Sequence, residues 1–141
     1  MFHQLLLGAC VTFASLMGAA VLWWYLKEII EWMEPWLRRP PHLIKPVLVV
    51  MMVIVSAMAM LALGVWLWAF VLERSAAFSS LEEAVYFSLV AYTTLGLGDV
   101  VVPEQFRILG GMIGANGFLM FGLLTATLTD SLRYVRGMQS D

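Results

Sequence analysis

AYTTLGLGDVVVPEQ, residues 91–105, is a flexible, hydroxyl-bearing run inside a strongly apolar chain. Two glycines, Gly96 and Gly98, flank a leucine, two threonines precede them, and Asp99 follows. In hydrocarbon, an extended backbone leaves polar groups unpaired, and each costs several kcal/mol. We therefore expect this run to persist only where something satisfies its carbonyl oxygens.

The composition indicates that a membrane is the solvent of this chain. Of its 141 residues, 62% are hydrophobic and 13% are charged, and the mean hydropathy is +0.87. A soluble domain usually carries charge on about a quarter of its residues. The net charge of -2 gives no indication of nucleic-acid binding, and the single cysteine excludes an internal disulfide framework. No histidine, cysteine and carboxylate cluster has metal-ligand spacing, and no organic cofactor is expected.

Three stretches are long enough to cross a bilayer, which takes about 20 apolar residues: 5–26, 47–72 and 108–129. The first lacks a basic start and ends in aromatic residues, so we interpret it as a retained helix and not as a signal peptide. A fourth apolar stretch, residues 84–98, is too short to span and suggests a re-entrant element. The expected fold is an all-α membrane protein with three transmembrane helices and one re-entrant helix.

A helix start precedes the short apolar stretch. Within SSLEE, either Ser79 with Glu82 or Ser80 with Glu83 makes a capping box. We expect a helix over residues 81–92, directly before the threonine-glycine run. Its C-terminal carbonyls, the negative end of the helix dipole, would point to the membrane midplane and stabilise a cation there.

The placement of lysine and arginine predicts the orientation. Basic residues concentrate between the first and second spans and after the third, whereas residues 73–107 contain only two. The positive-inside rule puts the linker and the C-terminus in the cytoplasm, and the N-terminus and residues 73–107 outside. The basic residues of the cytoplasmic segments are Lys27, Arg38, Arg39, Lys45, Arg133 and Arg136.

The linker over residues 27–46 predicts an interfacial elbow. It first alternates apolar and charged residues, which indicates an amphipathic continuation of the first helix. Prolines are then expected to break that helix. They are Pro35, Pro40, Pro41 and Pro46.

The segment Thr94–Gly98 has the backbone flexibility and the carbonyl oxygens that are needed to bind a dehydrated cation. Successive carbonyls can face one axis only if the residues alternate between left- and right-handed backbone conformations. Glycine adopts a positive φ without a Cβ clash, and Gly96 and Gly98 stand at alternate positions. A plain re-entrant turn is the alternative. It does not explain why a capped helix, paired threonines, alternating glycines and an acid coincide.

YFSLVAYTTLGLGD, residues 86–99, resembles the pore helix and selectivity filter of the potassium channel superfamily, whose filter usually reads TTVGYGD. The GLG filter also resembles the second pore loop of two-pore-domain potassium channels, although this chain has one such loop. Residues 107–130 look like the inner helix of bacterial two-helix potassium channels. Arg107 matches the arginine that opens that helix, Gly117 its gating-hinge glycine, and residues 121–126 the approach to the cytoplasmic bundle crossing.

The resemblance implies a pore domain over residues 47–132. Its parts would be an outer helix 47–72, a pore helix 81–92, a filter 93–99 and an inner helix 106–131. Residues 1–46 would add an N-terminal transmembrane helix with its linker, and residues 133–141 a short cytoplasmic tail.

The resemblance also implies which atoms bind the permeant ion. The K⁺ ligands would be the backbone carbonyls of Thr94, Leu95, Gly96 and Leu97, with the Thr94 hydroxyl. One chain supplies a quarter of a pore, so a homotetramer surrounded by membrane lipid is implied, with the filter on its four-fold axis. The residues implied to support the filter are Thr93, Gly98, Asp99, Tyr92 and Val90, and those of the inner gate and cavity are Phe121, Thr125 and Thr127.

Two positions depart from the family pattern. Leu97 stands where many potassium channels have a tyrosine whose hydroxyl bonds to pore-helix aromatics. Val90 stands where some bacterial channels have a glutamate that pairs with the filter aspartate. Asp99 therefore needs another partner, for which water and Tyr92 are the candidates. We expect a more deformable filter, with weaker selectivity or easier collapse.

Polar and small residues of the third span have two interpretations each. Asn116 is costly in lipid and should face the pore or a neighbouring helix, with helix packing favoured. Gly110 and Gly114 indicate close helix packing more than a dimer motif. Thr125 and Thr127 line a cavity or bond to their own helix backbone, which is the commoner fate.

The leading interpretation is a homotetrameric potassium-conducting channel of a prokaryotic inner or plasma membrane. A weakly selective monovalent cation channel on the same fold is the alternative that Leu97 and Val90 favour. A non-conducting membrane subunit is the alternative from another class. No enzyme is expected, since the spans contain no nucleophile-base or acid-base pair.

Overall fold

Apolar runs of membrane-spanning length form three long helices in the computed structural model, which describes residues 2–37 and 45–137. Every element of the described residues is helical. The helices are α1 (Phe2–Leu37), α2 (Lys45–Arg74), α3 (Leu81–Tyr92), the 3-10 turn η1 (Glu104–Phe106) and α4 (Arg107–Gly137).

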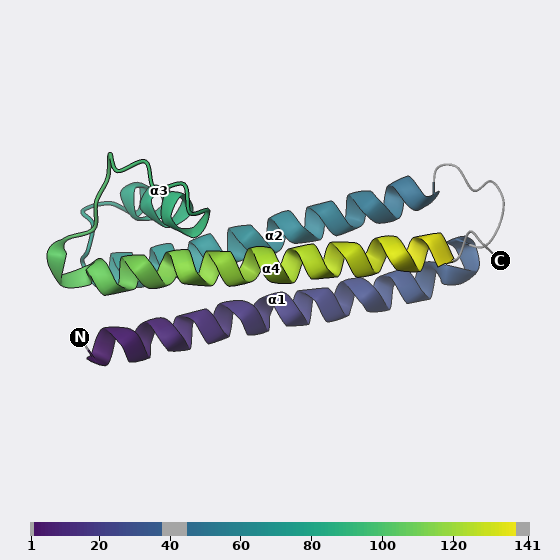
Figure 1. Cartoon of the computed structure of the whole chain (residues 1–141), viewed down its shortest axis with the longest axis horizontal. Helices are drawn as coiled ribbons and strands as arrows, with labels where there is room; N and C mark the ends of the chain where they lie inside the picture. The colour runs from purple at the N-terminus through teal and green to yellow at the C-terminus, as the bar shows by residue number, and fades with distance from the viewer. Residues whose placement is uncertain (1, 38–44, 138–141) are drawn as a thin grey trace.

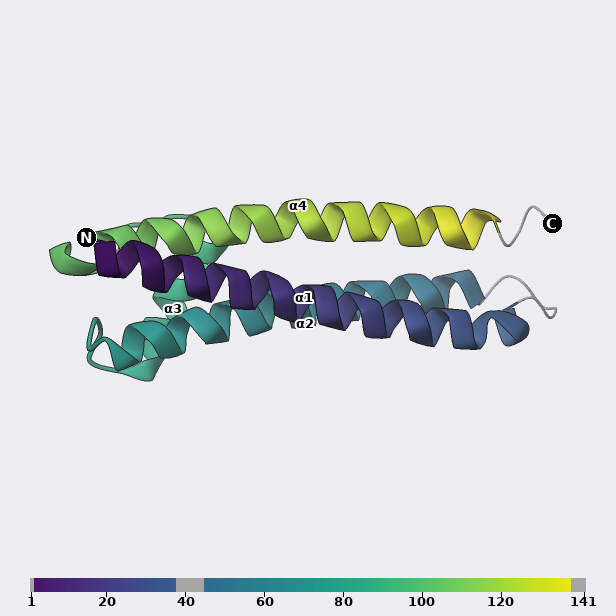
Figure 2. The same ribbon diagram turned by 90° about the horizontal axis from the view of Figure 1, so that it is seen from below.

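The long helices lie side by side, and α2 runs opposite to α1 and α4 (Figure 1; Figure 2). The short helix α3 lies at the end where α1 and α4 begin. The last turns of α1 and α4 and the first turn of α2 lie at the other end. The three-span topology therefore groups the N-terminus with the segment between α2 and α4.

The expected break at Pro35 is wrong, because α1 continues to Leu37. Proline removes one helical hydrogen bond and crowds the carbonyl four residues earlier. Packing on both sides of Pro35 opposes that cost: Ile30 and Leu37 are buried in one cluster with Val49 and Val53 of α2. The last turn of α1 is thus retained by contacts with α2.

The expected break at Pro46 is also wrong, since Pro46 is the second residue of α2. The N–H groups of a first helical turn have no intrahelical acceptor, so proline costs little there. Pro40, Pro41, Arg38 and Arg39 lie outside the described residues.

A side-chain cap fixes where α3 begins. Ser80 is the N-cap, and its hydroxyl accepts a hydrogen bond of 3.2 Å from the Glu83 backbone N–H. The Glu83 carboxylate accepts a second bond of 3.2 Å from the Ser79 hydroxyl. Of the two capping pairs that the sequence offers, the structure uses Ser80 and Glu83.

The last helix is longer than expected. The inner helix was expected to end at residue 131, but α4 continues to Gly137. No proline or glycine interrupts residues 123–136. Tyr134 also donates a hydrogen bond of 3.2 Å to Glu34 of α1, which attaches this extension to the bundle.

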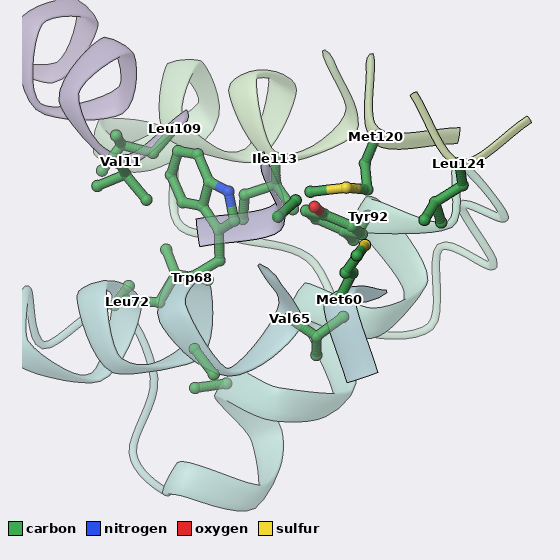
Figure 3. Packing of buried hydrophobic residues seen from close by; sticks show 14 residues of the cluster. Val11, Met60, Val65, Trp68, Leu72, Tyr92, Leu109, Ile113, Met120 and Leu124 are labelled. Atoms are coloured by element: carbon green, nitrogen blue, oxygen red, sulfur yellow. The ribbon is translucent and has the colours of Figure 1, made fainter. Parts of the chain in front are cut away.

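The C-terminal end of α3 is buried at the centre of the bundle. Tyr92, the last residue of α3, is fully buried. It lies between Met60 and Val65 of α2 and Ile113 and Met120 of α4 (Figure 3). The chain that follows Tyr92 therefore starts from a fixed point.

Candidate functional site

The loop after α3 is anchored to the last turn of that helix by its backbone N–H groups. Leu95 and Gly96 both donate to the Val90 carbonyl, at 3.0 and 3.3 Å, and Thr94 donates to the Ala91 carbonyl at 3.0 Å. These bonds satisfy helix-terminal carbonyls that would otherwise lack partners. Among the described residues, no hydrogen bond is made to the carbonyl oxygens of residues 94–97. Those oxygens are therefore open to a ligand.

The backbone of this loop alternates in handedness. φ is +58° at Thr94, +58° at Gly96 and +78° at Gly98. The glycines were expected to adopt positive φ; Thr94 was not. For a β-branched residue this conformation is strained, at about 1–3 kcal/mol. Thr94 stands two residues before Gly96, so the two-residue period was the signal that could have indicated it.

The glycines of the loop are required for their backbone conformation and not for space. A Cβ built on Gly96 or Gly98 meets no other atom of the described chain within 4 Å. The neighbouring leucine side chains are exposed in the single chain, Leu95 at 63% and Leu97 at 59%. The loop therefore presents an open surface.

Asp99 is held by Tyr86. The Tyr86 phenol donates a hydrogen bond of 2.5 Å to the Asp99 carboxylate. Of the two candidates, water and Tyr92, Tyr92 is not the partner, because its hydroxyl lies in the core and bonds with Ser15 of α1. Tyr86 stands one helical turn before Val90, so it reaches the same side of α3. That spacing was the signal in the sequence.

The bond to Tyr86 shifts both groups. Accepting it lowers the pKa of Asp99 below its ordinary value of 3.8. The same hydrogen bond, with a smaller contribution from desolvation, raises the pKa of Tyr86 above 10.0. Near neutral pH the pair is therefore a neutral phenol and a carboxylate.

Val90 and Thr93 brace the loop by different atoms. The Val90 side chain is nearly buried, at 9% exposure, and its carbonyl accepts the two bonds from the loop. The Thr93 hydroxyl donates a bond of 2.7 Å to the Leu89 carbonyl. Both residues hold the loop to α3 without using a charged group.

Gly117 allows α4 to approach the end of α3. A Cβ on Gly117 would lie 1.7 Å from the Tyr92 carbonyl oxygen, which no substitution at that position can accommodate in place. Gly114 lies over the same turn, with its Cβ position 3.5 Å from the Ala91 carbonyl oxygen. The favoured interpretation of Gly114 as a packing residue agrees with this contact. The hinge role of Gly117 stays a prediction.

The polar side chains of α4 that the sequence analysis singled out are bonded to their own helix or buried. The Thr125 hydroxyl donates to the Phe121 carbonyl at 2.8 Å, and the Thr127 hydroxyl to the Leu124 carbonyl at 2.9 Å. Asn116 is fully buried within the chain, which agrees with helix packing. Within residues 2–37 and 45–137, no three histidine, cysteine or carboxylate side chains form a group that could hold a metal ion.

Comparison with known proteins assigns the chain to a family. A family model described as "Ion channel" matches residues 47–134, more than half of the chain. The matched range contains most of α2, all of α3, the loop that follows α3 and most of α4. No curated protein and no solved structure matches the chain.

Proposed function

Because this chain belongs to the ion channel family that matches residues 47–134, we propose that four copies form a potassium-conducting channel with residues 94–97 as its filter. The family and the three apolar helices make the chain an integral membrane protein. The observation that carries the proposal is the alternation of positive φ at Thr94, Gly96 and Gly98.

Each feature of the loop supports the binding of a dehydrated cation. The N–H groups of Leu95 and Gly96 bond back to α3, and carbonyl oxygens of the same segment have no donor among the described residues. K⁺ filters use rings of carbonyl oxygens in place of the hydration shell of the ion. The Thr94 hydroxyl adds an oxygen, and the C-terminal end of the α3 dipole stabilises positive charge nearby.

The exposed apolar surface around the loop favours a tetramer. One chain offers a single row of carbonyls, so it cannot surround an ion. Leu89, Leu95, Leu97 and Phe118 are 48%, 63%, 59% and 72% exposed in the single chain. Four copies around the loop would cover these side chains and complete the coordination of the ion.

The orientation is proposed from charge. Lys27, Lys45 and Arg133 belong to the end of the bundle opposite α3, which the positive-inside rule assigns to the cytoplasm. We place the N-terminus and the filter loop outside, in a prokaryotic inner or plasma membrane. The partners are then lipid, three further copies and permeant monovalent cations, with K⁺ as cargo.

A weakly selective cation channel is the second candidate, and Leu97 favours it. The leucine side chain has no hydroxyl to bond with α3, and it is 59% exposed. At the outer end of the loop, the side-chain hydrogen bond that ties the loop to α3 is the one between Tyr86 and Asp99. A less constrained filter discriminates less between cations of different size.

Flux through the reconstituted full chain tests these functions. Liposomes with a K⁺ gradient should show flux for the wild type. Gly96→Ala should lower it more than about tenfold, because alanine strains a φ of +58° in each of four copies. Gly18→Ala is the matched control, since a Cβ there meets nothing within 4 Å and the residue is helical.

Three outcomes separate the candidates. A reversal potential that follows the K⁺ gradient in mixed K⁺ and Na⁺ supports the potassium channel, and one near zero supports the weakly selective channel. Absence of flux from the wild type supports a non-conducting subunit. Undiminished flux from Gly96→Ala would instead show that residues 94–97 are not the filter.

A further inference from the structure

α1 lies outside residues 47–134, the range that the family model matches, yet it makes hydrogen bonds to that range at three positions along its length. At the end that carries α3, the Gln4 side chain donates to the Gln105 carbonyl. At the opposite end, Glu34 accepts the bond from Tyr134. Between them, Ser15 Oγ and Tyr92 Oη share a hydrogen bond of 3.3 Å. This middle contact reaches the residue from which the filter loop departs.

Two glycines leave space for Tyr92 in the bundle: Gly64 beside its side chain and Gly117 beside its backbone. A Cβ on Gly64 of α2 would lie 2.3 Å from Tyr92 Oη, and one on Gly117 of α4 would lie 1.7 Å from the Tyr92 carbonyl oxygen. Figure 3 shows the ring between residues of α2 and α4. Tyr92 therefore connects α3 to α1 past both of the other helices.

The hydroxyl at the end of this side chain requires a partner. Tyr92 is fully buried and Ser15 is 8% exposed, so water has little access to either group. A buried hydroxyl that loses its only partner retains its desolvation cost. Within the described part of the chain, Ser15 is the side chain bonded to Tyr92 Oη. The bond thus fixes the end of α3 relative to α1.

We propose that Ser15 and Tyr92 are positioning residues through which α1 holds the inner end of the filter. The inference rests on the function proposed above. Tyr92 directly precedes Thr93 and Thr94, and Thr94 has the strained positive φ at the inner end of the loop. When the bond to α1 is lost, the tyrosine can shift and Thr94 can relax. Ion selectivity then depends on a helix outside the matched range.

Permeability ratios in planar bilayers test the coupling. Ser15→Ala and Tyr92→Phe should each lower the K⁺ to Na⁺ permeability ratio by about fivefold, the effect of one buried hydrogen bond. The double variant should be no worse than either single variant, because both remove the same bond. Ser15→Thr keeps a hydroxyl and should restore most of the ratio.

Ser56→Ala is the matched control. The Ser56 hydroxyl donates to the Val53 carbonyl of its own helix at 2.7 Å, so its loss leaves α3 untouched. This variant should keep the wild-type ratio. Tyr92→Phe removes one oxygen atom and keeps the ring, so it tests the coupling even if Ser15→Ala does not fold.

The failures are distinguishable. If the wild type carries no K⁺ or Gly96→Ala is undiminished, the proposed filter is wrong. The wild type and Gly96→Ala can behave as expected while the coupling fails. The coupling through α1 is then wrong, and the proposed filter is retained, if Tyr92→Phe keeps the wild-type permeability ratio or if the effects of Tyr92→Phe and Ser15→Ala add.

Discussion

The Tyr86 phenol donates a hydrogen bond of 2.5 Å to the Asp99 carboxylate, and so joins the first half of α3 to the far end of the loop that follows it. The two residues are 13 positions apart. With Leu97 and Val90 both apolar, this bond is the polar brace on the outer side of the proposed filter.

Removal of the brace should lower selectivity. We expect Tyr86→Phe to reduce the K⁺ to Na⁺ permeability ratio by about three- to tenfold, because a hydrogen bond to a charged group is lost. Bi-ionic reversal potentials measure this. Tyr25→Phe is the control, because Tyr25 is an exposed residue of α1. Its permeability ratio should match that of the wild type. Equal ratios for Tyr86→Phe and the control would show that the bond does not support the filter.

The pair should be insensitive to external pH over the neutral range. The lowered pKa of Asp99 means that its contribution is complete above its ordinary value of 3.8 and is lost as pH falls through the lowered value. The raised pKa of Tyr86 means that its contribution is complete below 10.0 and is lost as pH rises through the raised value.

Reversal potentials in bilayers should therefore stay constant as external pH is changed between about 5 and 9. Selectivity should fall only in stronger acid, and Asp99→Asn should abolish this fall in selectivity at low pH. A titration step near neutrality that disappears in Asp99→Asn would contradict the assigned protonation states.

Gly117→Ala should prevent normal packing of α4 on α3. The added Cβ would lie 1.7 Å from the Tyr92 carbonyl oxygen, and overpacking of this kind costs about 1–3 kcal/mol or more. We expect a lower melting temperature in detergent and less assembled protein. Gly122→Ala, with nothing within 4 Å, should be neutral. If Gly117→Ala melts like the control but alters open probability, the glycine serves as a hinge and not as a contact residue.

Leu97→Tyr should strengthen discrimination between cations. A phenol at this position offers a hydroxyl that can bond to α3, as in channels with a tyrosine in the filter. We expect a higher K⁺ to Na⁺ permeability ratio, by about threefold or more for one added hydrogen bond. Leu97→Phe adds the ring without the hydroxyl, so its K⁺ to Na⁺ permeability ratio should rise less. Equal ratios for leucine and tyrosine would show that position 97 does not limit selectivity.

Local features of the candidate site could be predicted because they depend on neighbours in sequence. Ser80 and Glu83 cap α3 three residues apart, and Gly96 and Gly98 have the positive φ that alternate glycines indicate. Thr94 stands on the two-residue period of these glycines, but its residue type argued against a positive φ, because threonine seldom adopts one. It does so here where Leu95 and Gly96 bond back to Val90.

The sequence by itself determined the three apolar helices, the short capped helix and the resemblance to ion channels. A bilayer imposes its length and polarity on each segment separately, so local composition is sufficient. Only the tertiary structure decided that Asp99 bonds Tyr86 and that Tyr92 bonds Ser15, 77 positions away. Such partners depend on how far each helix is rotated about its axis, and close contacts at Gly64 and Gly117 fix that rotation.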